Sequence, residues 1–315
     1  MDVIPARLAG IIPALPATER EVMHSARAQI FPDGTATVMV ADRAVFREGG
    51  WEERGPKRKP PAALFIDRAE EEYAAAEAAG RILSDGGVVL SDVRNLQRAV
   101  RRARARVRAL ARANSFAYFV TLTLDPAKVD RYAPEAVVRK MVVWLSNRVQ
   151  RQGLQYILVP ERHKDGAIHF HGFINDALRV IDSGTITRPG KKPRRARSAS
   201  DRAALLAAGG HVVYNLPEWP FGFSTAIELY GEYSAAVSYV CKYIGKQTAG
   251  EMPERMGGRW YYSGGDLAEP VVHFFDIEMA DALAVYGGRG YQFSVPEART
   301  SFYVFDLPRV AELGG

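Results

Sequence analysis

The segment from residue 116 to residue 174 constrains the fold most, because it reads as strand, helix, strand, strand. Residues 116–124 are apolar and β-prone and end at an Asp-Pro pair, and a helix is predicted from Pro134 to about Gln152. Two strands follow over residues 154–161 and 167–174, joined by a short Lys-Asp-Gly turn. Together with a later predicted helix, this pattern favours an α+β fold in which an antiparallel β-sheet has helices packed on one face.

Two histidines, His169 and His171, occupy alternate positions of the last of these strands. Side chains alternate across a strand, so both imidazoles project from one face while Phe170 enters the core on the other. An odd-length turn would place Glu161, on the adjoining strand, on the histidine face, and His163 competes with it as the third ligand. Two imidazoles and a carboxylate suit Mg²⁺ or Mn²⁺ and leave positions for a phosphate oxygen, although a catalytic zinc can use the same ligands.

A helix predicted over residues 232–246 contains two tyrosines and two lysines on one face. These polar residues, at spacings of three and four, are Tyr239, Lys242, Tyr243 and Lys246. A separate apolar stripe consists of Ala236, Val240 and Ile244. Free tyrosine has a pKa of about 10, so a nucleophilic tyrosine needs a cationic neighbour or a polarised phosphate, and Lys242 is placed to help. The alternative is two half-buried tyrosines at the edge of a core.

The net charge of +6 is concentrated in two runs. Eight arginines and no acidic residue lie between residues 94 and 113, and five of the seven residues from 191 to 197 are basic. Such runs can simply be solvated faces, but two of them favour a polyanionic partner. Residues 257–262 add an arginine and aromatic rings, which can stack on unpaired bases or form an ordinary strand. The candidate DNA contacts are Arg101, Arg102, Arg104, Thr121, Thr123, Lys191, Lys192, Arg194, Arg195, Arg259 and Trp260.

The rest of the chain suggests four regions. Residues 1–62 contain a predicted β-hairpin around residues 32–34 and a Gly-, Pro- and Lys-rich linker over 49–61. Residues 63–113 are predicted to be helical and Arg-rich, residues 114–265 form the predicted catalytic core, and residues 266–315 have no assigned role. An amphipathic helix is indicated by the stripe Leu96, Val100, Ala103, Val107 and Leu110. Residues 188–200 and the glycine pair 209–210 read as an insertion or mobile loop.

Several function classes are disfavoured by what the sequence lacks. Cys241 is the single cysteine, so neither an intrachain disulfide nor a thiolate zinc site is expected, and Cys241 is expected to pack in the core. No apolar run is long enough to cross a bilayer and no secretory signal is evident, so a cytoplasmic protein without a membrane partner is expected. No P-loop motif occurs, so no nucleotide cofactor is expected and unwinding would depend on a separate helicase.

Three motifs in order make the chain resemble HUH-type rolling-circle replication initiators, most closely those of the Microviridae, the small single-stranded DNA phages. The motifs are FVTLTLDP at 119–126, HFHGF at 169–173 and YVCKYIGK at 239–246. The resemblance implies a ferredoxin- or RRM-like palm. It also implies the following roles: metal ligation by Glu161, His169 and His171, first and second nucleophiles Tyr239 and Tyr243, and stabilisation of the phosphate or phenolate by Lys242.

The implied reaction is transesterification at a replication origin, on single-stranded or supercoiled DNA. It leaves a 5′-phosphotyrosyl link and a free 3′-OH, which a DNA polymerase of the bacterial host extends in the host cytoplasm after a host helicase opens the duplex. A relaxase usually carries its tyrosines before the histidine motif, and a single-strand transposase is typically shorter. A non-catalytic DNA-binding protein, with structural histidines and tyrosines, is the alternative of a different class.

Overall fold

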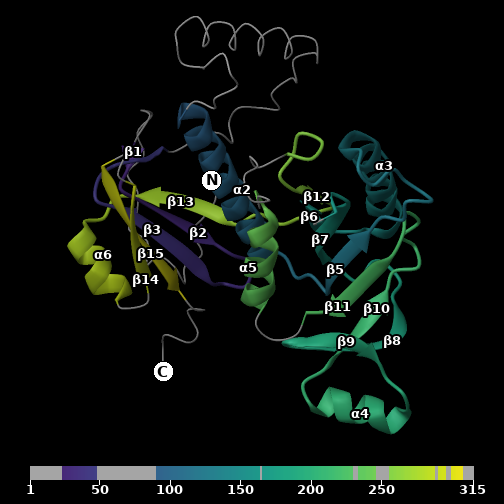
Figure 1. Ribbon diagram of the computed structural model, residues 1–315. Coiled ribbons are helices and arrows are strands. Elements are labelled where there is room, and N and C mark those ends of the chain that lie inside the picture. The colour runs from purple at the N-terminus through teal and green to yellow at the C-terminus, as the bar shows by residue number, and fades with distance from the viewer. Residues whose placement is uncertain are drawn as a thin grey trace, which may run out of the picture. The chain divides into compact units, whose positions relative to one another are not determined.

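The computed structural model describes residues 23–47, 90–163, 165–229, 233–245, 255–287, 290–295 and 299–307. Figure 1 shows the chain, which divides into two compact units. The first unit combines residues 1–89 with residues 269–315, and the second consists of residues 90–268. None of the described helices is long and apolar enough to cross a membrane.

The first unit is built on a five-stranded antiparallel sheet. Its strands, in spatial order, are β13 (Val271–Phe275), β2 (Ala26–Ile30), β3 (Ala36–Ala41), β15 (Thr300–Leu307) and β14 (Gly290–Val295), with α6 (Met279–Tyr286) and a β1 (Met23–His24) and β4 (Phe46–Arg47) pair completing the unit. The predicted hairpin is confirmed: Asp33 accepts hydrogen bonds from the amide and hydroxyl of Thr35, and Gly34 has the positive φ of 83° that favours glycine. The early hairpin and the C-terminal region therefore share one sheet.

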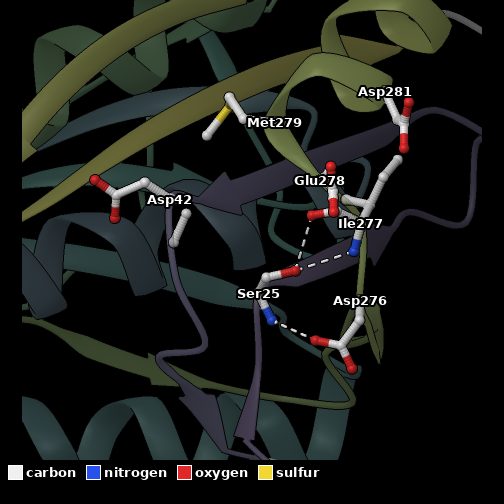
Figure 2. Close-up of a pocket in the computed structure, with 8 residues that line it drawn as sticks. Ser25, Asp42, Asp276, Ile277, Glu278, Met279 and Asp281 are labelled. Carbon is white, nitrogen blue, oxygen red and sulfur yellow. Dashed lines mark hydrogen bonds between the residues drawn. The ribbon is translucent and has the colours of Figure 1, made fainter.

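A hydrogen-bonded junction in this first unit borders an acidic pocket (Figure 2). The amide of Ser25 donates to Asp276, and its hydroxyl bonds the backbone of Ile277. Asp42, Glu278 and Asp281 complete the acidic lining. The pocket contains none of the residues that the sequence analysis singled out.

The second unit contains an eight-stranded sheet whose neighbouring strands all pair antiparallel. In spatial order its strands are β12 (Tyr262–Gly264), β6 (Tyr156–Arg162), β7 (Ile168–Ile174), β5 (Tyr118–Thr123), β11 (Ser224–Glu228), β10 (His211–Asn215), β8 (Ile181–Arg188) and β9 (Lys191–Arg195). The predicted α+β class with an antiparallel sheet is confirmed. The predicted strands of residues 116–174 are β5, β6 and β7, the centre and one flank of this sheet.

Helices cover both faces of this sheet, which corrects the expectation of helices on one face only. On one face α3 (Pro134–Gln152) packs Met141 and Leu145 into a core with Leu158 and Phe170. On the other face α2 (Leu90–Ala113) and α5 (Tyr233–Tyr243) form a second core with the next residues along the same strands, among them Val159. Because the strands are apolar at successive positions here, both faces must be shielded from water.

Two further sequence predictions can be compared with these elements. The stripe on α2 is confirmed, since Val100, Ala103, Val107 and Leu110 are buried. The segment at residues 188–200 is not a mobile loop: it contributes to β8, β9 and α4 (Ala199–Ala207), which a hydrogen bond from the amide of Asp201 to the Ser198 side chain caps. Charge disguised these strands, because every residue of β9 is exposed and carries no apolar alternation. The predicted linker at 49–61 lies outside the described residues.

Candidate active site

The β6–β7 hairpin brings a carboxylate and an imidazole into contact. Glu161 lies directly opposite His169 in the register, so its side chain is on the histidine face, as the sequence predicted. Its Oε2 is 3.1 Å from Nε2 of His171. The close approach of these strands requires glycine at Gly172, because a Cβ there would lie 1.9 Å from the carbonyl oxygen of Ile157.

Two threonines of β5 orient the two histidines. Thr121 and Thr123 pair in register with His171 and His169, and their hydroxyls lie 3.0 and 3.3 Å from the respective Nδ1 atoms. A hydroxyl at Nδ1 favours the tautomer in which Nε2 carries the free lone pair. The sequence analysis grouped both threonines with the DNA contacts, whereas the structure shows them against the imidazoles.

The electrostatics of the site favour a neutral His169. Burial lowers the pKa of this imidazole, and the neighbouring His163 and His171 lower it further. A neutral imidazole is the form that binds a metal. His163 itself is exposed: its Nδ1 lies 3.3 Å from Asp165, and its ring centroid lies 5.1 Å from that of His169.

The donor chemistry of this face suits a divalent cation. The described residues contain no three His, Cys, Asp or Glu side chains already gathered around one point as metal ligands. They do offer two imidazoles whose Nδ1 atoms are held by hydroxyls, and a carboxylate in direct contact with one of them. Mixed nitrogen and oxygen ligands of this kind fit Mg²⁺, Mn²⁺ or Zn²⁺.

The position of α5 is set by its apolar stripe and by an arginine at its C-terminal end. Val240 and Ile244 are buried against α2 and β6, and Cys241 is buried beside them, as expected of a packing residue. Arg104 of α2 donates from Nε and Nη2 to the carbonyl oxygen of Ile244, at 3.1 and 2.9 Å. These bonds satisfy a carbonyl that the end of the helix leaves without an intrahelical partner, and Gly245 then turns the chain with a φ of 69°.

This packing brings both tyrosines of α5 to the histidine face. The Tyr243 ring stacks on His171, with centroids 4.6 Å apart and an interplanar angle of 17°. The Tyr243 hydroxyl donates a short hydrogen bond to the hydroxyl of Tyr239. Burial raises the pKa of Tyr243, and the bond to Tyr239 and the nearby Glu161 charge add to this effect. Tyr239 is 44% exposed.

An aromatic residue missed by the sequence analysis links the two elements. Phe119 of β5 stacks on His171, with centroids 6.3 Å apart, and meets the Tyr239 ring edge-on at 5.7 Å. The signal was present, because Phe119 alternates with Thr121 and Thr123 and so lies on the same face of β5. Lys242 is exposed on α5, and Lys246 lies outside the described residues.

The candidate DNA contacts occupy different places. Arg101 and Arg102 are exposed on α2, whereas Arg104 bonds Ile244 as described. The four basic candidates on β9 are exposed: Lys191, Lys192, Arg194 and Arg195. Arg259 is exposed, with its guanidinium carbon 5.9 Å from the Tyr262 ring centroid. Trp260 is half-buried near the α2–α5 core, and Arg255 lies over its ring.

Comparison with known proteins gives one match. A family model for replication-associated proteins of the ORF2 group matches residues 117–248. No curated protein and no solved structure matches the chain. The matched segment begins before β5 and ends after α5, so it includes every predicted metal ligand and both tyrosines. Over residues 117–248 the chain is therefore similar to this family of replication-associated proteins.

Proposed function

We propose that this protein is a rolling-circle replication initiator of the HUH class, most like those of the Microviridae. It cuts single-stranded DNA at an origin by metal-dependent tyrosine transesterification. The observation that carries the proposal is the stack of Tyr243 on His171, with Tyr239 hydrogen-bonded beyond it. The family match over the same segment supports the link to replication.

In the proposed reaction a tyrosine Oη attacks the phosphorus of a phosphodiester. The new bond joins Oη to phosphorus, the bond from phosphorus to the 3′ oxygen breaks, and that oxygen takes up a proton. The products are a 5′-phosphotyrosyl link and a free 3′-OH. Because one phosphoester replaces another, the bond energy is conserved, and the reverse attack by a 3′-OH reseals the strand.

Tyr239 is the first nucleophile in this proposal. It is the more exposed of the two tyrosines, and its oxygen accepts the hydrogen bond from Tyr243. A donor aimed at the attacking oxygen stabilises the negative charge that forms on it when its proton leaves. Tyr243, whose proton is retained by a raised pKa, acts second, and the exposed Lys242 steadies the phosphate. Lys246 is proposed for the same helix face from its spacing alone.

The proposed metal ligands are Glu161, His169 and His171, with His163 as the alternative to Glu161. A bound Mg²⁺ or Mn²⁺ would supply Lewis-acid polarisation of the phosphate at this face. Thr121 and Thr123 hold the imidazoles in the ligating tautomer. Phe119 fixes the ring plane of His171 by stacking on it.

The proposed partners follow from the reaction. The substrate is single-stranded or supercoiled origin DNA, and a separate helicase and polymerase of the bacterial host act on the nicked product in the host cytoplasm. The family match supports DNA at an origin as the partner. Candidate contacts to this DNA are the exposed arginines of α2, Arg101 and Arg102, and the pair Arg259 and Trp260.

A covalent adduct tests the proposal. The full-length protein is incubated with Mn²⁺ or Mg²⁺ and a single-stranded DNA library that has a randomised centre and a fluorophore at the 3′ end. Because the tyrosine bonds the 5′ phosphate of the downstream fragment, that fragment carries the label onto the protein. We expect an SDS-resistant labelled band that EDTA abolishes, and sequencing of the captured DNA gives the cleavage site.

Variants assign the roles. Tyr239→Phe should abolish the first adduct, Tyr243→Phe should retain it, and Tyr132→Phe, an exposed tyrosine on a loop before α3, should behave as wild type. Binding without any adduct, under every metal and sequence tried, would mean a non-catalytic DNA-binding protein. Transfer of the label to an unrelated DNA strand would instead indicate a transposase. Full activity in both phenylalanine variants would overturn the assignment of the nucleophiles.

A further inference from the structure

An edge of the eight-stranded sheet carries a concentration of positive charge far from the tyrosines. Residues 181–207, which form β8, β9 and α4, are named here the basic hairpin (Figure 1). They include seven basic residues against two acidic ones and no aromatic residue. This surface lies entirely within the second unit.

Both acidic residues of the basic hairpin are used within it. Asp201 forms a two-pronged pair with Arg194, at 2.6 and 2.8 Å, and also accepts from the amide of Arg197. Arg194 holds the pKa of the Asp201 carboxyl well below its usual range. Asp182 pairs with Arg202 at 2.7 Å. These two pairs join α4 to β8 and β9, so they fix the surface in shape as well as balance two of its charges.

The remaining basic side chains present one sign of charge to solvent. Arg188, Lys191, Lys192 and Arg195 make no ion pair with any described residue, and the last three are exposed. Lysines on an edge strand often serve only to prevent edge-to-edge pairing. That purpose does not require one sign of charge throughout, nor a helix pinned by two ion pairs behind the strand. A fixed, single-sign surface is what a polyanion recognises.

We propose that the basic hairpin binds the phosphate backbone of duplex DNA flanking the cleavage site. Single-stranded DNA is the less suitable ligand, because its binding sites combine charge with aromatic rings on which unpaired bases stack. The basic hairpin has no such ring. Phosphate contacts of this kind position a duplex without reading its sequence. The proposal rests on the proposed function for the location of the duplex, and on the charge pattern alone for its binding.

The sheet order gives the distance over which the duplex must extend. Five strand-to-strand steps separate β7, which carries the histidines, from β9. At about 4.8 Å a step, the basic hairpin lies about 24 Å from the histidines along the sheet. That length corresponds to about seven base pairs at 3.4 Å each. A duplex that ends closer to the cleavage site than this would not reach β9.

The test compares two triple variants of the full-length chain. Lys191→Gln, Lys192→Gln and Arg195→Gln remove three charges from the basic hairpin. The matched control removes three exposed charges from α3, with Arg139→Gln, Lys140→Gln and Arg151→Gln. Affinity for a blunt DNA duplex of mixed sequence, and for single-stranded oligothymidine, is measured by fluorescence anisotropy over a series of salt concentrations.

We expect the basic-hairpin variant to bind the duplex more weakly, with a slope of log affinity against log salt that is shallower by about 2.7, from 0.9 for each of three phosphates. Oligothymidine binding and the control variant should match wild type. An unchanged duplex affinity and slope, or an equal loss for oligothymidine, would overturn the proposal. Thermal melting of each variant checks that the fold is intact.

Adduct formation separates this proposal from the proposed function. On the single-stranded library both triple variants should form the tyrosine adduct as wild type does. If no protein forms an adduct and the slope still falls, duplex binding holds and the proposed function fails. If adducts form and the slope is unchanged, the reverse is true. On the captured cleavage sequence, an added stem longer than about seven base pairs should tighten binding by wild type but not by the basic-hairpin variant.

Discussion

Replacing Thr121 by valine should weaken Mn²⁺ binding by about tenfold. The hydroxyl of Thr121 lies 3.0 Å from Nδ1 of His171, and valine keeps the branched shape while it removes that oxygen. The imidazole then loses the acceptor that holds its proton on Nδ1, so Nε2 is less often free to bind a metal.

The magnitude follows from the geometry. A neutral hydrogen bond contributes about 0.5 to 1.5 kcal/mol, and about 1.4 kcal/mol corresponds to a tenfold change in affinity. Loss of an outer partner of a metal-binding histidine typically costs about 10- to 100-fold. Thr123 provides the matched comparison, because its hydroxyl lies 3.3 Å from His169, beyond the usual range. Thr123→Val should therefore weaken Mn²⁺ binding less, by about threefold or under.

The assay needs neither DNA nor turnover. Mn²⁺ is titrated into wild type and each valine variant, and the free ion is quantified by its electron paramagnetic resonance signal. Melting temperatures show whether a variant has lost its fold. Unchanged Mn²⁺ affinity in Thr121→Val, or a larger loss in Thr123→Val, would refute the reasoning that these hydroxyls orient metal ligands.

Three further changes test the surrounding structure. Arg104→Gln removes the two bonds to the carbonyl oxygen of Ile244 and should lower the free energy of unfolding in urea by about 1.5 to 3 kcal/mol, whereas the exposed Arg101→Gln should change it by under about 0.5 kcal/mol; equal effects would contradict the helix-end role. Gly172→Ala places a methyl group inside a neighbouring carbonyl, so we expect a loss of soluble, cooperatively melting protein, and a normal melting curve would argue against the β6–β7 register. Because the pKa of His169 is lowered on folding, the unfolded state binds more protons at this site as the pH falls below about 6.5, and stability declines. His169→Asn should flatten that decline in urea midpoints between pH 7.5 and pH 5.5, and an unaltered profile would exclude His169 as its source.

Local periodicity explains why much of the candidate site could be predicted from the sequence. The bounds of α3 follow from a proline at its start and a glycine after its end. The pairing of Glu161 with His169 follows from an odd-length turn and the alternation of strands, and the register confirms it. The burial of one stripe of α2 follows from its spacing of three and four.

The features that were missed depend on contacts between distant parts of the chain. The pairing of β2 with β13 joins segments more than 240 residues apart, and no local pattern marks it. The bond from Arg104 to Ile244 spans 140 residues, and the sequence shows only one arginine among eight. The strand β9 was hidden because its residues are all polar or proline, so hydrophobic alternation could not indicate it.

The identity of the residue that bonds to DNA tests the central claim most directly. Trypsin places the two tyrosines of α5 in separate peptides, because no lysine or arginine lies between residues 202 and 242: residues 203–242 carry Tyr239 and residues 243–246 carry Tyr243. After capture of the labelled strand and nuclease trimming, mass spectrometry should find a nucleotide remnant on peptide 203–242. Its loss in Tyr239→Phe would complete the assignment. A remnant on a peptide outside α5, or none on any tyrosine while DNA is cut, would contradict the proposed mechanism.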